Sequence, residues 1–209
     1  MTELLRDFHN CGYIYNDLKP ENVCVGDHVK DFKDFRELNL HELKLIDFGL
    51  SSPYLVKDKN GTMVHIKKGY KQFQGNIAFA SYNSFVKKQV SRRDDFISLV
   101  YFLYYLVTGN VLFADCASGS RDQIIRMKEM KINTKPKDFL TSEDLECFIP
   151  VSEYIFSIKF DAEPDYDKIK FMYMQILLDR DMVPSKEFDW SKKFIEKEKK
   201  KKEEVQNKL

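Results

Sequence analysis

The hydrophobic and polar positions along the chain predict a mainly helical protein with a few short strands. Residues 95–108 are the most apolar stretch, and their hydrophobic side chains fall on nearly every side of a helix. A helix that is apolar all round is typical of a buried central helix. Asp95 is expected to cap its start, and Gly109 is expected to end it.

Further helices are predicted around this central one. Apolar residues recur at helical spacing in residues 2–9, 120–131, 142–149 and 166–179. Side chains expected to face inward from the last helix are Ile169, Met172, Tyr173, Ile176 and Leu177. Residues 191–209 are rich in Lys and Glu, and we expect a solvated helical tail there, because the two charge types offset each other.

Short apolar runs predict strands at residues 13–15, 23–25 and 43–46. Residues 27–42 are charged and lack periodicity, which indicates a surface loop. Residues 50–75 are polar and contain Pro53, Asn60-Gly61 and Gly69, so the sequence predicts a long loop. A loop of this length inside a compact domain is usually functional.

Composition narrows the classes of function. The chain has 209 residues, 43% of them hydrophobic, and a net charge of +1, so one large domain is expected, with no nucleic-acid or membrane partner. It shows no signal-peptide pattern, and we expect an intracellular protein of the cytoplasm, the nucleus or both. The cysteines are far apart, and we expect them to be reduced and mostly buried, without a structural zinc site. They are Cys11, Cys24, Cys116 and Cys147.

Two motifs indicate phosphoryl-transfer chemistry. Asp17-Leu18-Lys19-Pro20-Glu21-Asn22 precedes Asp47-Phe48-Gly49, and each lies next to a hydrophobic stretch. In protein kinases this spacing supplies a carboxylate that accepts the proton of the attacking hydroxyl and an ammonium that offsets phosphoryl charge. It also supplies an amide oxygen and a second carboxylate that hold Mg²⁺. Either motif alone is weak evidence, but both in this order are specific.

On these residues the chain resembles the C-terminal lobe of the casein kinase 1 family of serine/threonine protein kinases. Gly12–Asn22 is similar to the family's catalytic loop, Leu45–Leu50 to its metal-binding strand and turn, and Gly75–Asn83 to the end of its activation segment. Further matches are Ser91–Asp95, which is the most family-specific, Lys159–Asp161, Pro164–Tyr166 and Phe188–Trp190. The resemblance implies an α+β, mainly α-helical, protein-kinase-like C-terminal lobe over residues 1–190, followed by the tail 191–209.

The resemblance also implies roles for five residues. Asp17 would be the catalytic base or hydroxyl orienter, and Lys19 would contact the γ-phosphate of ATP. Asn22 and Asp47 would hold Mg²⁺ with the bound ATP. Asp95 would bond the backbone amides of the catalytic loop and fix its shape. The implied cofactors are therefore ATP and Mg²⁺, and the implied partner is a protein substrate with a Ser or Thr hydroxyl.

Several positions depart from the family pattern. Asn16 stands where the family has Arg, so activation by phosphorylation is not expected. Asn76 and Ala78 replace a Thr and an Arg, and Ala78 cannot contact acidic substrate residues as that Arg does. Val100 replaces a Gly, and we expect crowding there. Three lysines of the activation segment would either attract acidic peptides or form a solvated face; they are Lys67, Lys68 and Lys71.

Two arginines before the central helix, Arg92 and Arg93, are interpreted as intralobe ion-pair residues, with a contact to substrate acids as the alternative.

Only sixteen residues precede Asp17, and the chain contains no G-x-G pair, so a Gly-rich loop and the ATP-binding Lys have no place in it. One hypothesis is a fragment or truncated gene product of a casein kinase 1-type serine/threonine kinase, inactive as the 209-residue chain alone. A second is a catalytically inactive binding or scaffolding module. A third is a lobe that completes its site with a separately encoded N-terminal lobe.

Overall fold

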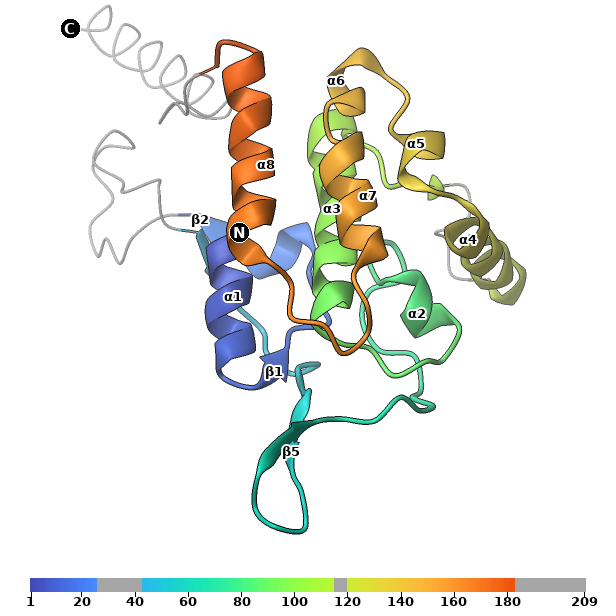
Figure 1. The fold of residues 1–209 in the computed structure, drawn as a ribbon. Helices are drawn as coiled ribbons and strands as arrows, with labels where there is room; N and C mark the ends of the chain where they lie inside the picture. Colours follow the sequence, from blue (N-terminus) through green and yellow to red (C-terminus); the bar gives the residue numbers. More distant parts are fainter. Residues whose placement is uncertain (26–42, 115–119, 183–209) are drawn as a thin grey trace, which may run out of the picture.

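The computed structural model describes residues 1–25, 43–114 and 120–182, and the described part is mainly helical (Figure 1). Its helices are α1 (Thr2–Asn10), α2 (Tyr82–Phe85), α3 (Arg92–Thr108), α4 (Arg121–Asn133), α5 (Pro136–Phe139), α6 (Glu143–Glu146), α7 (Ile149–Ser157) and α8 (Tyr166–Asp179), with a 3₁₀ turn at Pro20–Asn22. The predicted loop 27–42, the match at 188–190 and the tail 191–209 lie outside the described residues.

The strands of the described residues form three small antiparallel pairs. They are β1 (Tyr13–Ile14) with β4 (Ser52–Pro53), β2 (Val23–Val25) with β3 (Leu43–Leu45), and β5 (Leu55–Lys57) with β6 (Met63–His65). Short strand pairs beside a helical body confirm the predicted α+β, mainly α-helical fold class. They also confirm strands near residues 13–15, 23–25 and 43–46.

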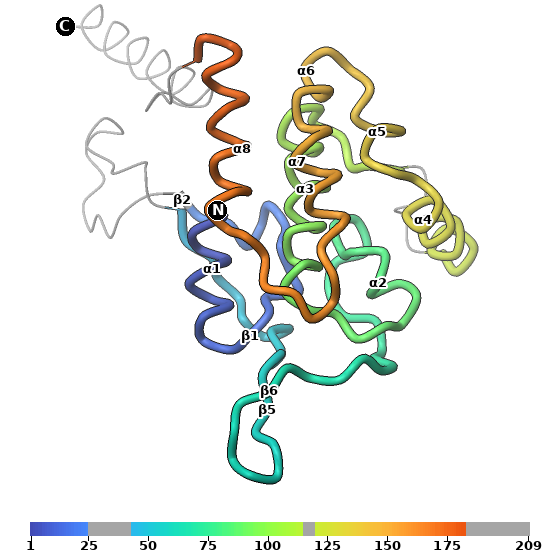
Figure 2. The backbone as a smooth tube through the Cα atoms, viewed as in Figure 1, coloured from blue at the N-terminus to red at the C-terminus, as the bar shows by residue number. Residues whose placement is uncertain are grey.

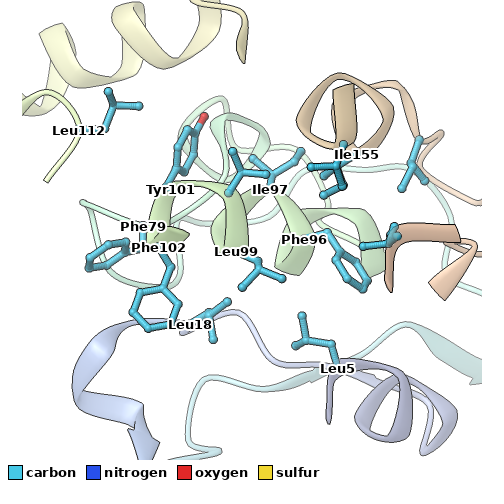
Figure 3. Packing of buried hydrophobic residues seen from close by; sticks show 14 of the residues in the cluster. Leu5, Leu18, Phe79, Phe96, Ile97, Leu99, Tyr101, Phe102, Leu112 and Ile155 are labelled. Carbon is cyan, nitrogen blue, oxygen red and sulfur yellow. The ribbon is translucent and has the colours of Figure 1, made fainter. Parts of the chain in front are cut away.

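Helix α3 passes through the hydrophobic core. Phe96, Ile97 and Val100 are fully buried, and Figure 3 shows Leu5 and Leu18 on one side of the helix. The predicted central helix is therefore confirmed over its first half, and Val100 is accommodated without exposure. Its last turns differ from the prediction, because Leu106 is 61% exposed and Val107 is 41% exposed.

The start of α3 is capped by a residue other than the one expected. The Asp94 carboxylate accepts a hydrogen bond from the Ser91 backbone amide at 2.8 Å, and Asn83 Nδ2 donates to the same carboxylate at 2.9 Å. The prediction that Asp95 caps this helix is wrong, since its carboxylate bonds elsewhere in the chain. Gly109 ends the helix at φ 70°, as predicted.

Helix α8 has the predicted bounds and lies beside α1 (Figures 1 and 2). The Asp165 side chain caps it by accepting from the Lys168 amide at 2.9 Å. Ile169 is fully buried, while Met172, Tyr173, Ile176 and Leu177 are half-buried. Ion pairs between Glu3 and Lys170, at 2.7 Å, and between Arg6 and Asp167, at 2.9 Å, connect the two helices.

The predicted loop 50–75 contains regular structure that the sequence pattern did not reveal. Strands β5 and β6 form a hairpin, visible at the bottom of Figure 2, and Asn60-Gly61 lies in its turn. Asp58 Oδ1 accepts from the amides of Asn60 and Thr62, which stabilises this turn. The hairpin has no buried face that would give an apolar alternation, so its strands were not predicted.

The region 136–157 also differs in detail. The predicted helix 142–149 is two helices, short α6 followed by α7, and α5 was not predicted. Pro150 lies in the first turn of α7, where a missing N–H is tolerated. The prediction of mostly buried cysteines is wrong for Cys11 and Cys24, which are exposed, while Cys147 is half-buried and Cys116 lies outside the described residues. No helix in the described ranges is long and apolar enough to cross a bilayer.

Lys131 of α4 is a buried cation that anchors the chain preceding α2. It is 1% exposed, and its Nζ donates to the carbonyls of Ile77, Ala78 and Ala80 at 3.0, 2.8 and 2.7 Å. The Tyr101 ring lies 4.4 Å from Nζ, a cation–π distance. Burial lowers the pKa of this ammonium, yet its three hydrogens match three carbonyl acceptors.

Lys131→Met keeps the apolar stem but leaves three carbonyls without this donor. We expect the free energy of unfolding to fall by about 2–4 kcal/mol, because buried polar groups without partners are costly. Urea denaturation measures the loss, and Lys137→Met at an exposed position of α5 is the control. Equal losses in the two variants would show that the buried ammonium has no special role.

Candidate active site

A buried carboxylate at the start of α3 holds the segment that carries the first motif. Asp95 is 1% exposed, and its two oxygens accept from the backbone amides of Tyr15, at 2.7 Å, and Asn16, at 2.8 Å. Asn16 has a left-handed backbone at φ 68°, a conformation that Asn tolerates better than most residues. The carboxylate therefore fixes the chain immediately before Asp17.

His9 joins this carboxylate to two further helices. Its Nε2 lies 2.9 Å from Asp95 Oδ2, and its Nδ1 lies 3.0 Å from the Tyr166 hydroxyl of α8. The Tyr54 hydroxyl donates to the His9 carbonyl at 2.8 Å. Sequence reasoning missed this contact, because His9 belongs to none of the quoted motifs and lies 157 positions from Tyr166, which was noted only as part of the match at Pro164–Tyr166.

Asp17, Lys19 and Asn22 make direct contact with one another. Asp17 is 3% exposed, and its Oδ2 accepts from Lys19 Nζ at 2.6 Å and from Asn22 Nδ2 at 2.9 Å. Asn22 Nδ2 also donates to the Asp17 carbonyl at 3.0 Å. Asp17 Oδ1 is buried and has no hydrogen-bond partner within the described ranges. One oxygen is thus fixed while the other remains able to accept a proton.

Lys19 stays charged beside this carboxylate. Its hydrogen bond with Asp17 raises the pKa of the ammonium above its usual value. The pairing of β2 with β3 sets Val23 opposite Leu45, and the Ile46 amide donates to the Asn22 carbonyl at 3.1 Å. This register brings the D-F-G turn to the end of the first motif.

Backbone pairing of β2 with β3, and not a side-chain contact, places Asp47 next to the first motif. Asp47 is exposed, its φ is 59°, and its Oδ1 accepts from the Gly49 amide at 3.2 Å. Within the described ranges, no hydrogen bond joins the side chains of Asp47 and Asn22. The neighbouring Phe48 ring stacks on Phe8 of α1 at 5.4 Å, which attaches the turn to the lobe.

A network of polar side chains occupies the position where the family resemblance places an Arg. Asn16 Nδ2 donates to the Leu50 carbonyl and to Ser52 Oγ, both at 2.9 Å. Lys71 Nζ donates to the same Ser52 Oγ at 2.8 Å, and burial lowers the pKa of Lys71. These bonds attach the activation segment to the catalytic loop without a phosphate. Lys67 and Lys68 are exposed and lie outside this network.

The other departures and the two arginines have structural contacts of their own. Asn76 Oδ1 accepts from the Ala78 amide at 2.8 Å, so this side chain bonds its own segment. Arg92 lies over the Tyr54 ring at 4.6 Å, and Arg93 Nη1 donates to the Ile158 carbonyl at 3.0 Å. Arg92 also pairs with Glu163 at 3.9 Å and Arg93 with Asp94 at 3.8 Å, which are the intralobe ion pairs that we expected.

Gly75 marks the closest approach of the activation segment to the catalytic loop. A Cβ at this position would lie 2.5 Å from the Asn16 carbonyl oxygen. Its φ of 104° is also unfavourable for L side chains. Only a residue without a side chain therefore fits between the two segments.

Gly75→Ala is expected to destabilise the fold by about 2–4 kcal/mol, because strain adds to a backbone clash. Gly61→Ala is the matched control, since Gly61 has a similar φ of 81° but no atom within 4 Å of the added Cβ. Thermal and urea unfolding measure the stability loss in both variants. The loss in Gly61→Ala reports backbone strain alone, and the additional loss in Gly75→Ala reports the clash with Asn16. Equal stability would mean that the contact with Asn16 is not a close one.

Comparison with known proteins places the chain in a family. Residues 1–159 match the sequence model of the protein kinase domain. A protein of Encephalitozoon cuniculi named probable casein kinase I homolog is 32% identical over 193 residues, which cover 91% of this chain and 54% of that protein. Casein kinase 1-like protein HD16 of rice is 30% identical over 171 residues, or 79% of this chain and 22% of the relative.

A third relative, inactive tau-tubulin kinase ttbk-6 of Caenorhabditis elegans, is 27% identical over 190 residues, which cover 89% of this chain and 61% of that protein. The chain thus spans just over half the length of the Encephalitozoon and Caenorhabditis relatives, and less than a quarter of HD16. The domain match and the similarity to casein kinase 1 homologues confirm the predicted resemblance. The chain belongs to the protein kinase family and is casein kinase 1-like.

Proposed function

We propose that this chain supplies the catalytic-loop half of a serine/threonine kinase site, which transfers the γ-phosphoryl group of ATP to a protein hydroxyl. The observation that supports this most is the environment of Asp17. One buried oxygen is fixed by Lys19 and Asn22, while Oδ1 has no partner among the described residues. A carboxylate held in this way can orient a hydroxyl and accept its proton.

Each side chain has a defined task in this reaction. The substrate hydroxyl donates its hydrogen to Asp17 Oδ1, and its oxygen attacks the γ-phosphorus. The bond from this phosphorus to the bridging oxygen breaks as the new bond forms, and ADP leaves. Lys19 stabilises negative charge on the transferring group from its place beside Asp17.

Asn22 and Asp47 are the residues that would hold Mg²⁺. Because Asn22 Nδ2 bonds Asp17, its Oδ1 is the atom that a cation would use, and exposed Asp47 adds a carboxylate. The described residues contain no group of three or more His, Cys, Asp or Glu that could hold a metal. Two oxygen ligands still suit Mg²⁺, which keeps waters and binds substrate phosphates. When bound, it would offset charge on these phosphates.

The phosphate-covering part of the site is proposed to come from outside the 209 residues. They contain no G-x-G pair, and the chain spans about half of its casein kinase relative from Encephalitozoon. Phosphate positioning is worth several kcal/mol of barrier lowering, so we expect the 209-residue chain alone to be inactive. Exposed Lys67 and Lys68 would favour acidic protein substrates.

A second candidate function is a binding or scaffolding module without catalysis. It is favoured by the bonds of Asn16 to Leu50 and Ser52, which fix the activation segment without a phosphate switch. One relative, ttbk-6, is also named as an inactive kinase. In such a module the contacts of Asp17 with Lys19 and Asn22 would serve the shape of the loop.

The test is phosphoryl transfer by the native protein isolated from the cells that express it. With radiolabelled ATP, Mg²⁺ and acidic Ser/Thr peptides, we expect Asp17→Asn to lower kcat by about a thousandfold. Asp47→Asn should raise the Mg²⁺ concentration needed for half-maximal rate. Asp7→Asn, at an exposed position of α1, is the control and should keep the wild-type rate.

Calorimetric titration of ATP into the same protein separates the two candidate functions. A kinase site should bind ATP in a Mg²⁺-dependent way, and Asp47→Asn should weaken this binding. A native protein that binds no ATP and transfers no phosphate would contradict the kinase proposal and favour the binding module.

A further inference from the structure

We propose that a basic pocket beside the activation segment binds a phosphoryl dianion. The pocket has a volume of about 410 Å³ and lies where the activation segment, the turn after α2, the start of α3 and the chain between α7 and α8 meet. It is lined by Lys68, Gly69, Lys88, Gln89, Arg93, Lys159, Phe160 and Asp161.

Hydrogen bonds connect the walls of this pocket. The Gln89 amide donates to the Gly69 carbonyl at 2.8 Å, and Tyr70 forms a β-bridge with Lys88. Arg93 Nη1 donates to the Ile158 carbonyl, which attaches the chain between α7 and α8 to the start of α3. The cationic side chains therefore extend from a backbone that is already fixed, and less ordering is needed on binding.

An aromatic contact anchors the wall that carries Lys159. Phe160 is 6% exposed, and its ring meets the His65 ring edge-on at 5.0 Å. His65 belongs to β6, so the β5–β6 hairpin packs against the segment that carries Lys159. Lys159 and Asp161 flank Phe160 in sequence and line the pocket, so this contact fixes the backbone that carries both.

The charges of the pocket favour an anion. Four cationic side chains face one carboxylate, that of Asp161. Lys68, Lys88 and Lys159 are exposed and form no ion pair with any other residue in the described ranges, so their charges are uncompensated. Like charges brought together repel, and a bound anion relieves that repulsion.

A phosphoryl group fits this arrangement better than a single carboxylate. It carries nearly two negative charges and three acceptor oxygens at neutral pH, which several separate cations can share. Arg93 is partly paired with Asp94, since its Nε lies 3.8 Å from Asp94 Oδ2. Its guanidinium therefore contributes a positive charge at a fixed position. The lysines have flexible stems and can close on the ligand.

This pocket is separate from the proposed catalytic residues. None of Asp17, Lys19, Asn22, Asp47 or Asp95 lines it. Phosphate binding there does not rest on the proposed phosphoryl transfer, and an inactive binding module would have the same pocket. The dianion has two sources, a phosphorylated side chain of a protein and free phosphate, and competition between them tells which one is preferred.

The experiment measures fluorescence anisotropy of a labelled Gly/Ser peptide with one phosphoserine, at constant ionic strength, on the 209-residue chain. The double variant Lys88→Ala with Lys159→Ala should bind about tenfold more weakly, because two exposed charge contacts are lost. The matched control, Lys59→Ala with Lys137→Ala, removes the same charge from exposed sites outside the pocket. Asp161→Asn should bind more tightly than wild type.

Inorganic phosphate is the competitor. Displacement of the peptide at a concentration near its own Kd would identify free phosphate as a sufficient ligand, and weak competition would identify a phosphorylated peptide. Both results support the site if the pocket variants respond as expected. Absence of saturable binding of both probes, or equal weakening in the two double variants, would overturn it.

Discussion

The buried carboxylate of Asp95 is the interaction on which the candidate site depends. Its oxygens accept from the amides of Tyr15 and Asn16 and meet His9 Nε2, all within 2.9 Å. A buried charge is stable only when its lone pairs are satisfied, and hydrogen bonds to charged groups contribute about 1.5–3 kcal/mol each. The same bonds give the chain before Asp17 its left-handed turn, so stability and site geometry share one cause.

The adjacent Asp94 performs a parallel task for the activation segment. Its carboxylate accepts from Ser81, which precedes α2, and from Asn83 within α2. Two consecutive residues at the start of α3 therefore hold two segments that are far apart in sequence. Most of the first half of the central helix is buried in the core, and this helix sets the position of one segment relative to the other. Lys131 adds a third attachment, from α4.

The sequence pattern predicted the parts of this arrangement that carry local signals. All-round apolarity identified α3, a period of 3.6 gave α8 its bounds, and motif spacing grouped Asp17, Lys19 and Asn22, which the structure brings into contact. Features that arise from tertiary contacts were missed. Nothing local marks His9 as a partner of Asp95, and nothing marks Lys131 as a buried cation. The β5–β6 hairpin was missed because neither of its strands alternates between buried and exposed side chains.

Amide hydrogen exchange in wild type and Asp95→Asn tests the central claim most directly. The Asn side chain has one acceptor oxygen and one NH₂ group, so at least one of the two amides loses its partner. We predict exchange about tenfold to a hundredfold faster at Tyr15 or Asn16 in the variant, with unchanged protection at Ile155 in the core. Equal exchange rates at Tyr15 and Asn16 in the two proteins would contradict the claim that this carboxylate holds the catalytic loop.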